Sequence, residues 1–147
     1  MANTGFRVAV LGATGAVGAE ILQVLEHAVQ QACGAIFRRA QLEQEKRGMG
    51  TTCALLLVAG PPGGARGFIA HVGDSRAYLL KSGTDELEQI SEDHSLVQQL
   101  VRQGQLDPSD AANHPQRNIV TRALGIDPDV KPDVFVLLPV QGDRYLL

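Results

Sequence analysis

The chain has 147 residues, of which 44% are apolar and 20% are charged, a balance typical of globular proteins and unlike that of disordered chains. This length favours a single compact domain. The net charge is -3 and the Lys and Arg residues are scattered, which argues against nucleic acid or a lipid membrane as a partner.

The two cysteines and the first apolar run bear on where the protein works. Cys33 and Cys53 lie in periodic apolar segments, which favours buried free thiols over a disulfide and suits a reducing cytoplasm. The apolar run Val8–Ala19 follows only one basic residue, and Glu20 then begins an amphipathic pattern where a cleavage region would lie. We therefore expect no signal peptide and a cytoplasmic protein.

The first 44 residues predict a strand followed by a long helix. Phe6–Leu11 is a short run rich in β-branched residues that Gly12 stops, a pattern typical of a buried strand. From Ala16 to about Gln44 the apolar residues keep helical spacing, which predicts one long helix or a helix pair. Gly34 is the expected place for a bend, although an isolated glycine costs only about 1 kcal/mol relative to alanine.

The rest of the chain alternates between strand and helix patterns. Short apolar runs separated by Gly and Pro predict strands at Thr51–Ala59, Gly67–Val72, Ala77–Leu80, Leu87–Ile90, Val134–Leu138 and Arg144–Leu147. Helical spacing predicts helices at Ser91–Gln103, at a short segment that Asp107 caps before Pro108, and at Asn118–Leu124.

A glycine loop joins the first strand to the first helix. The loop reads Leu-Gly-Ala-Thr-Gly-Ala-Val-Gly over residues 11–18, and with its flanks it resembles the start of aspartate-semialdehyde dehydrogenase over residues 1–26. The resemblance implies a Rossmann-like strand, loop and helix whose loop binds the phosphates of NADP. Its candidate cofactor-binding residues are Gly12, Thr14, Gly15, Ala16, Val17 and Gly18.

NADP binding competes with a simpler interpretation of this loop. A dinucleotide site needs a second parallel strand after the helix, with a residue that binds the ribose. Here the helical period continues through residues 28–40. We therefore favour a loop that only turns a strand into a helix.

Several motifs from residue 27 onward occur in the order and spacing of bacterial type 2C protein phosphatases. They are GMGTT (residues 48–52), IAHVGDSRAYL (69–79), EDHSLV (92–97), HPQRN (114–118), TRALG (121–125) and GDR (142–144). Residues 27–147 resemble the central part of this metal-dependent family. The resemblance implies hydrolysis of phosphoserine and phosphothreonine in phosphoprotein substrates, with Mn²⁺ or Mg²⁺ as cofactor.

The same resemblance identifies which metal ligands the chain holds. In the family, two metals roughly 3.5–4 Å apart activate a bridging water, and aspartates from Asp-Gly-Met-Gly-Gly, Ser-Asp-Gly and Asp-Asn segments hold them. None of these segments occurs here. Asp74 matches the aspartate that approaches an additional, weakly held metal, and it is the one metal-ligand candidate. Because its partner ligands are missing, we favour the alternative, a turn in which Asp74 bonds its own backbone.

The other polar residues near these motifs have structural interpretations. We expect Arg76 to donate to an ion pair or hydrogen bond, and the histidines to be structural because they lack paired metal-ligand spacing. Those histidines are His71, His94 and His114, and Asp127, Asp129 and Asp133 are expected to be solvated turn residues.

The sequence as a whole predicts one hybrid domain over residues 1–147, with a dehydrogenase-like start (1–26) and a phosphatase-like body (27–147) truncated at both ends. The fold class is α+β: an incomplete antiparallel β-sandwich flanked by helices, with the Rossmann-like segment grafted on. We expect a catalytically inactive fragment or chimera of a phosphatase. The alternatives are an NADP-binding fragment and a non-enzymatic domain that binds partners. Unpaired strand edges predict a homo-oligomer.

Overall fold

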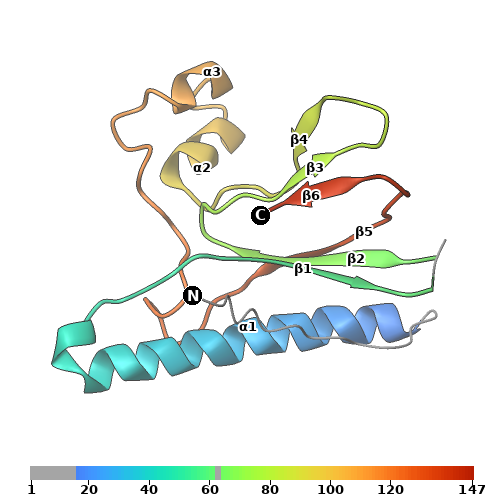
Figure 1. Cartoon of the computed structure of the whole chain (residues 1–147). Coiled ribbons are helices and arrows are strands. Elements are labelled where there is room, and N and C mark those ends of the chain that lie inside the picture. Colours follow the sequence, from blue (N-terminus) through green and yellow to red (C-terminus); the bar gives the residue numbers. More distant parts are fainter. Residues whose placement is uncertain (1–15, 62–63) are drawn as a thin grey trace, which may run out of the picture.

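The computed structural model describes residues 16–61 and 64–147, which form an α+β arrangement of helices and two antiparallel sheets (Figure 1). The helices are α1 (Ala16–Leu42), α2 (Leu96–Arg102) and α3 (Pro108–Ala111), with a 3₁₀ turn η1 (Gln44–Lys46) after α1. The strands are β1 (Cys53–Ala59), β2 (Arg66–Val72), β3 (Tyr78–Leu80), β4 (Leu87–Gln89), β5 (Asp133–Leu137) and β6 (Arg144–Leu146). The predicted strand at Phe6–Leu11 lies outside the described residues.

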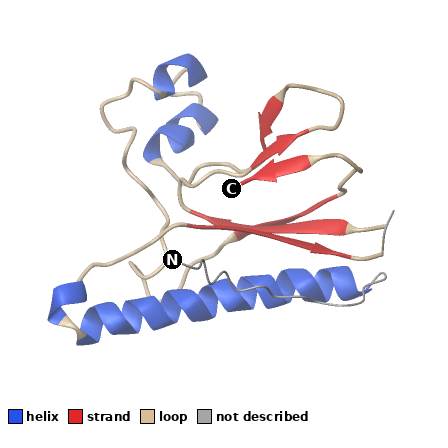
Figure 2. Cartoon of the chain, in the orientation of Figure 1, coloured by secondary structure: helices blue, strands red, loops and turns tan. Residues whose placement is uncertain are grey.

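The two sheets stack as layers, and α1 covers the outer face of one of them. Their strand orders are β1-β2-β5 and β4-β3-β6, and every pairing is antiparallel. Figure 2 shows α1 along one side of the first sheet, the second sheet on the other side, and α2 with α3 at one end. The predicted antiparallel sandwich with helices is confirmed in outline.

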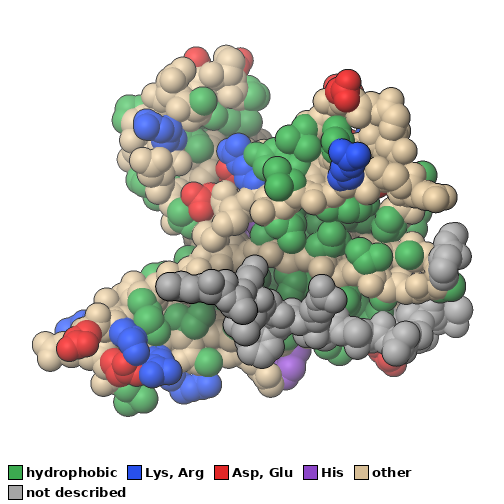
Figure 3. All heavy atoms as spheres, in the orientation of Figure 1, with side chains coloured by type: hydrophobic (Ala, Val, Ile, Leu, Met, Phe, Trp, Pro, Cys, Tyr) green, Lys and Arg blue, Asp and Glu red, His purple; other side chains and the backbone are tan. Residues whose placement is uncertain are grey.

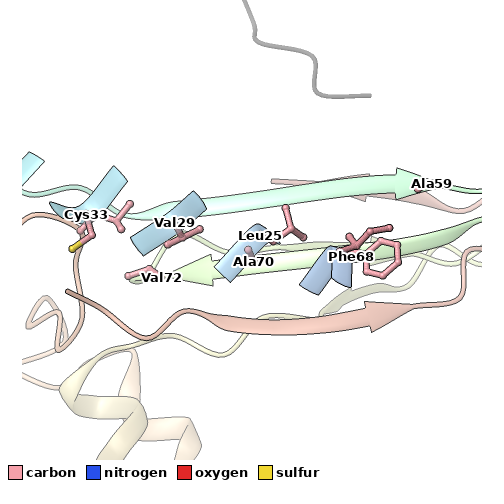
Figure 4. Packing of buried hydrophobic residues seen from close by; sticks show 9 residues of the cluster. Leu25, Val29, Cys33, Ala59, Phe68, Ala70 and Val72 are labelled. Carbon is pink, nitrogen blue, oxygen red and sulfur yellow. The ribbon is translucent and has the colours of Figure 1, made fainter. Parts of the chain in front are cut away.

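The core between α1 and the first sheet follows from a four-residue spacing of apolar side chains. Ile21, Leu25, Val29 and Cys33 lie on one stripe of α1, and all four are buried. They pack against alternate residues of β2, including Phe68, as Figure 4 shows. Burying each large apolar side chain contributes about 1.5–3 kcal/mol. The helix is continuous from Ala16 to Leu42, so Gly34 does not interrupt it.

Strand β2 is buried on both faces. After Arg66 every residue of the strand is buried, and the strand lies between α1 on one face and the second sheet on the other (Figure 1). Its edges are also covered, since β1 and β5 pair with it over seven and five residues. The loop that follows β2 is therefore anchored to the most buried strand of the described fold.

Local capping explains where the two short helices begin. The Ser95 hydroxyl accepts a hydrogen bond from the Gln98 amide, and α2 starts at the next residue, Leu96. The Asp107 carboxylate accepts from the Ser109 amide at 2.8 Å and Pro108 occupies the first turn of α3, as predicted. The predicted helix over Ser91–Gln103 is too long at its start, because residues before Ser95 bond to the turn after β2 instead.

The predicted helix over Asn118–Leu124 is wrong. This segment is irregular with isolated β-bridges, and its backbone pairs with distant segments: Leu96 donates to the Ile119 carbonyl, and Leu124 exchanges two hydrogen bonds with Thr51. Ile119, Val120 and Thr121 are β-branched, which lowers helix propensity and suits extended backbone. Tertiary pairing therefore overrides the apolar spacing.

The core yields a prediction on stability with a matched control on the same helix. Leu25 is 8% exposed, whereas its neighbour Val24 is 61% exposed. We expect Leu25→Ala to lower the free energy of unfolding by about 2–4 kcal/mol. Val24→Ala should change it by less than about 0.5 kcal/mol. Urea unfolding followed by circular dichroism measures both, and equal losses would contradict this packing of α1.

Candidate functional site

The turn that follows β2, Gly73 to Arg76, is the centre of the candidate site. Gly73 is buried and has a φ of +106°, a backbone conformation that glycine adopts without strain. A Cβ at this position would lie 2.3 Å from Cγ2 of Thr52. Both the conformation and the space therefore require glycine here. The Ser75 and Thr52 hydroxyls are 2.6 Å apart, which ties the turn to the start of β1.

Asp74 is the exposed residue of this turn. Its carboxylate reaches a cleft between the turn and the segment that contains α2 and α3. In the described residues it accepts no hydrogen bond from its own backbone, so the alternative in which Asp74 only caps its turn is not observed. The sequence-predicted candidate thus has a free carboxylate at a cleft.

The cleft beside Asp74 has a volume of about 450 Å³ and is lined by both polar and apolar groups. Its lining residues are Asp74, Arg76, Asp93, Ser95, Val97, Gln98, Pro108, Ala111, Ala112, Arg117 and Asn118. On the face drawn in Figure 3, charged side chains of both signs lie in small groups among hydrophobic and uncharged ones. The mixed lining of the cleft suits a polar ligand. The described side chains on the face in Figure 3 form no broad basic patch.

Arg76 forms an ion pair with Asp93 across the floor of the cleft. Its guanidinium donates three hydrogen bonds to the Asp93 carboxylate, at 2.7, 3.0 and 3.1 Å. The Asp93 carboxylate, and to a lesser degree Tyr78, raises the pKa of Arg76 above its usual range. The predicted structural role of Arg76 is confirmed. The pair also occupies the Asp93 carboxylate, which leaves it less available to a cation.

Two buried histidines hold the turn from below. His71 is 1% exposed and its Nε2 donates to the Ser75 carbonyl at 2.6 Å. His94 is 5% exposed, and its Nδ1 accepts a 3.0 Å hydrogen bond from the Gly73 amide. The His94 amide donates to the Gly73 carbonyl at 2.8 Å. The structural roles expected for these two histidines are confirmed. Their spacing in the sequence does not predict that both contact the same turn.

Asp133 and Arg122 complete the network on the far side of His94. Asp133 lies 3.1 Å from His94 Nε2, and Arg122 donates to Asp133 at 2.8 Å. The prediction that Asp133 is a solvated turn residue is wrong, because it opens β5 and its carboxylate is engaged by both neighbours. Burial raises the pKa of Asp133, but the hydrogen bonds from His94 and Arg122 outweigh this effect and hold it below its usual range.

The titration of His94 follows from its burial. Burial lowers the pKa of His94, and the nearby Arg122 charge lowers it further, whereas the hydrogen bond to Asp133 acts in the opposite direction. The net direction is downward, so the imidazole is neutral at neutral pH. A neutral ring is also what the Gly73 hydrogen bond requires, since an imidazolium has no acceptor nitrogen.

The described residues do not by themselves fit a two-metal centre. Mn²⁺ and Mg²⁺ take several oxygen ligands, chiefly carboxylates. Within residues 16–61 and 64–147, no three His, Cys, Asp or Glu side chains gather closely enough to hold a metal ion. Asp74 supplies one carboxylate at the cleft, and Asp93 is paired with Arg76.

The candidate NADP-binding residues fall mostly outside the described part of the chain. Gly12, Thr14 and Gly15 lie outside the described residues, and Ala16, Val17 and Gly18 begin α1. The helix then continues to Leu42, so residues 28–40 contain no strand. Within the described residues, the strand pairings are all antiparallel, and no strand occupies the segment where a dinucleotide site needs one.

Both cysteine thiols are free. Cys33 is buried as predicted, whereas Cys53 is half-buried. Burial raises the pKa of the Cys53 thiol. Among the described helices, none has the length and apolar character needed to cross a membrane.

Comparisons with known proteins agree on the phosphatase resemblance. The family model "Protein phosphatase 2C" matches residues 18–100, so the match begins within the segment that resembles the dehydrogenase. The serine/threonine phosphatase stp of Listeria innocua is 42% identical over 128 residues, which are 87% of this chain and 48% of that protein. The serine/threonine protein phosphatase PstP of Mycobacterium tuberculosis is 41% identical over 130 residues, 88% of this chain and 24% of that protein.

Solved structures show the same similarity in three dimensions. The serine/threonine phosphatase of S. agalactiae aligns with a TM-score of 0.76 and 35% identity, covering 86% of this chain and 50% of that one. The catalytic domain of PstP in complex with two manganese ions aligns with a TM-score of 0.69 and 37% identity, covering 84% and 48%. The chain therefore spans between a quarter and a half of these relatives. It belongs to the protein phosphatase 2C family.

Proposed function

We propose that this chain forms part of a metal-dependent phosphatase that acts on phosphoserine and phosphothreonine in proteins. The observation that carries the proposal is the Gly73–Arg76 turn, which exposes the Asp74 carboxylate at a polar cleft while buried contacts fix its backbone. Relatives at about 40% identity are named serine/threonine phosphatases, and a solved relative binds two manganese ions. Mn²⁺ or Mg²⁺ is the cofactor class that such carboxylates suit.

The same observations argue against catalysis by these 147 residues alone. A metal pair carries about four positive charges and needs several carboxylates on one frame. Asp74 offers one, and the neighbouring Asp93 carboxylate already neutralises Arg76. These ligands are too few to hold two metals against hydration. We propose that the 147-residue chain binds a cation weakly through Asp74 and does not turn over substrate by itself.

Phosphate release tests this proposal directly. With added Mn²⁺, we expect the purified chain to release no phosphate from a phosphothreonine peptide or an aryl phosphate above the buffer rate, because too few ligands hold the metal. Asp74→Ala should leave this baseline unchanged, as should Asp85→Ala in an exposed loop outside the cleft. Turnover that Asp74→Ala abolishes and Asp85→Ala preserves would show a working metal site and contradict the proposal.

Binding of NADP by the glycine loop is the alternative function. We propose that residues 12–18 bind no dinucleotide, and that residues 1–26 share their pattern with the dehydrogenase without its activity. The continuous helix α1 supports this, because a dinucleotide site needs a second strand where the helix runs. Titration calorimetry with NADP should give no binding heat at millimolar cofactor, and saturable binding would restore the alternative.

Self-association is a further proposal, with a second copy of this chain as the partner. In the described sheets, β1 and β5 are edge strands, and exposed apolar side chains lie on or beside them: Val58, Val136, Leu138 and Val140. Unpaired edges with apolar neighbours favour pairing with another chain. We expect sedimentation at tens of micromolar to show a dimer, and Val58→Lys with Leu138→Lys to shift it toward monomer. A wild-type monomer at that concentration would contradict self-association.

A further inference from the structure

The two buried histidines have no task in the chemistry proposed above, yet together they contact the turn at three backbone atoms. His94 accepts from the Gly73 amide and donates its own amide to the Gly73 carbonyl. His71 donates to the Ser75 carbonyl. These contacts bracket Asp74, whose own side chain is exposed. The backbone on both sides of Asp74 is thus fixed by imidazole rings that lie 5.0 Å apart.

We propose that His71 and His94 are positioning residues that form a clamp on the Gly73–Ser75 turn, and that the clamp is proton-sensitive through His94: its unprotonated Nδ1 holds the Gly73 amide, and protonation of His94 releases that side of the turn. The clamp itself is independent of the proposed phosphatase activity. The value of the clamp to catalysis or metal binding rests on the proposed function.

The hydrogen bonds assign the protonation state of His94. Since the Gly73 amide donates to Nδ1, that nitrogen carries no proton, and the proton of the neutral ring is on Nε2. Nε2 then donates to Asp133 at 3.1 Å. Arg122 Nη1 also lies 3.1 Å from Nε2, but both atoms carry hydrogens, so Asp133 is the acceptor for both. A second proton on His94 would face the Gly73 amide and break that bond.

His71 holds the other side of the turn. Its Nε2 donates to Ser75, and within the described residues its buried Nδ1 has no hydrogen-bond partner. This contact uses the ring as a donor, whereas His94 uses an acceptor nitrogen that a proton would block. The pH response of the clamp therefore depends on the Gly73–His94 bond.

The charged groups around the clamp are few and favour the neutral state on balance. From β5, Asp133 favours a charged His94, but the Arg122 guanidinium faces the same nitrogen and also neutralises Asp133. From β2, the facing titratable group is His71. Glu92 points toward α2, where Arg102 binds it. Burial adds to the Arg122 effect and lowers the pKa of His94.

The pH direction follows from proton binding in the two states. An unfolded histidine has a pKa of about 6.5, whereas the clamped ring resists protonation. Below about pH 6.5 the unfolded or opened state therefore binds more protons, and acid favours opening. Stability of the turn is complete above this pH and falls as the pH drops toward the lowered pKa of His94. Carboxylates such as Asp133 titrate at lower pH, with an ordinary pKa of about 3.9. The effect of protonating His94 is therefore observed at higher pH than the effect of protonating the carboxylates.

Nitrogen NMR of the histidine rings tests the clamp in the wild-type chain. At pH 7.5 we expect His94 as the neutral Nε2–H tautomer, with a coupling across the hydrogen bond between the Gly73 amide nitrogen and Nδ1. As the pH falls from 7.5 to 5, the amide signals of Gly73 to Arg76 should shift together with the His94 ring signals. A cationic or Nδ1–H His94 at pH 7.5, or turn signals that ignore the ring titration, would overturn the proposal.

Matched variants separate the clamp from a merely structural role. His94→Asn offers an oxygen acceptor to the Gly73 amide and does not titrate. It should retain the turn signals at pH 7.5 and abolish their shift between pH 7.5 and 5. His71→Gln keeps an N–H donor for the Ser75 carbonyl and should keep the shift, as should His27→Gln at an exposed site on α1. A wild-type shift in His94→Asn would overturn the clamp.

If a variant fails to fold, the pH titration of the wild-type chain decides the proposal.

A separate experiment tests whether the clamp matters for cation binding. Mn²⁺ is added at pH 7.5, and broadening of the Asp74 amide signal is compared between wild type and His94→Asn. Equal broadening in both, with the pH result as expected, supports the clamp and the cation site together. Absence of broadening in both, with the pH result intact, rejects Asp74 as a cation site and leaves the clamp standing.

Discussion

The hydrogen bond from the Gly73 amide to Nδ1 of His94 is the contact on which the candidate site depends. It is buried, so water offers no substitute for either partner, and an unmade bond there would cost about 1–3 kcal/mol. Because Gly73 also requires a positive φ and the absence of a Cβ, the turn has little freedom to adjust. These buried contacts therefore fix the backbone that carries the exposed Asp74 carboxylate.

Two parts of the described fold hold the Gly73–His94 contact in place. The turn leaves the end of β2, whose two faces are covered by α1 and by the second sheet. The His94 segment is held in place by residues 118–124, since the Thr121 amide donates to the His94 carbonyl. Core packing thus fixes one side of the turn, and a long-range backbone pairing fixes the other. The cleft lies where these two supports meet.

Sequence patterns predicted the parts of this structure that depend on local periodicity. Four-residue spacing predicted α1, and alternating or short apolar runs predicted the described strands to within one or two residues. The capping of α3 by Asp107 follows from chemistry within three residues. The motif that contains Asp74 also identified the candidate site, because its glycine and its polar residues occur together.

The contacts that organise the site could not be predicted in this way. His71 and His94 lie 23 residues apart and Asp133 a further 39, so no local pattern joins them. Their association follows from the pairing of β2 with β5, which places Asp133 opposite His71 in the register. The non-helical path of residues 118–124 likewise depends on hydrogen bonds to Thr51 and His94. These features depend on pairing between segments that are far apart in the sequence, and local residue spacing does not predict such pairing.

Hydrogen exchange of single amides tests the central claim, that buried contacts fix the turn bearing Asp74. At pH 7.5 we expect the Gly73 amide to exchange as slowly as the amides of Phe68 to Val72, because His94 and the core protect it. The Gly83 amide, in an exposed turn, serves as the reference for fast exchange. Exchange of Gly73 at the rate of Gly83 would contradict the account.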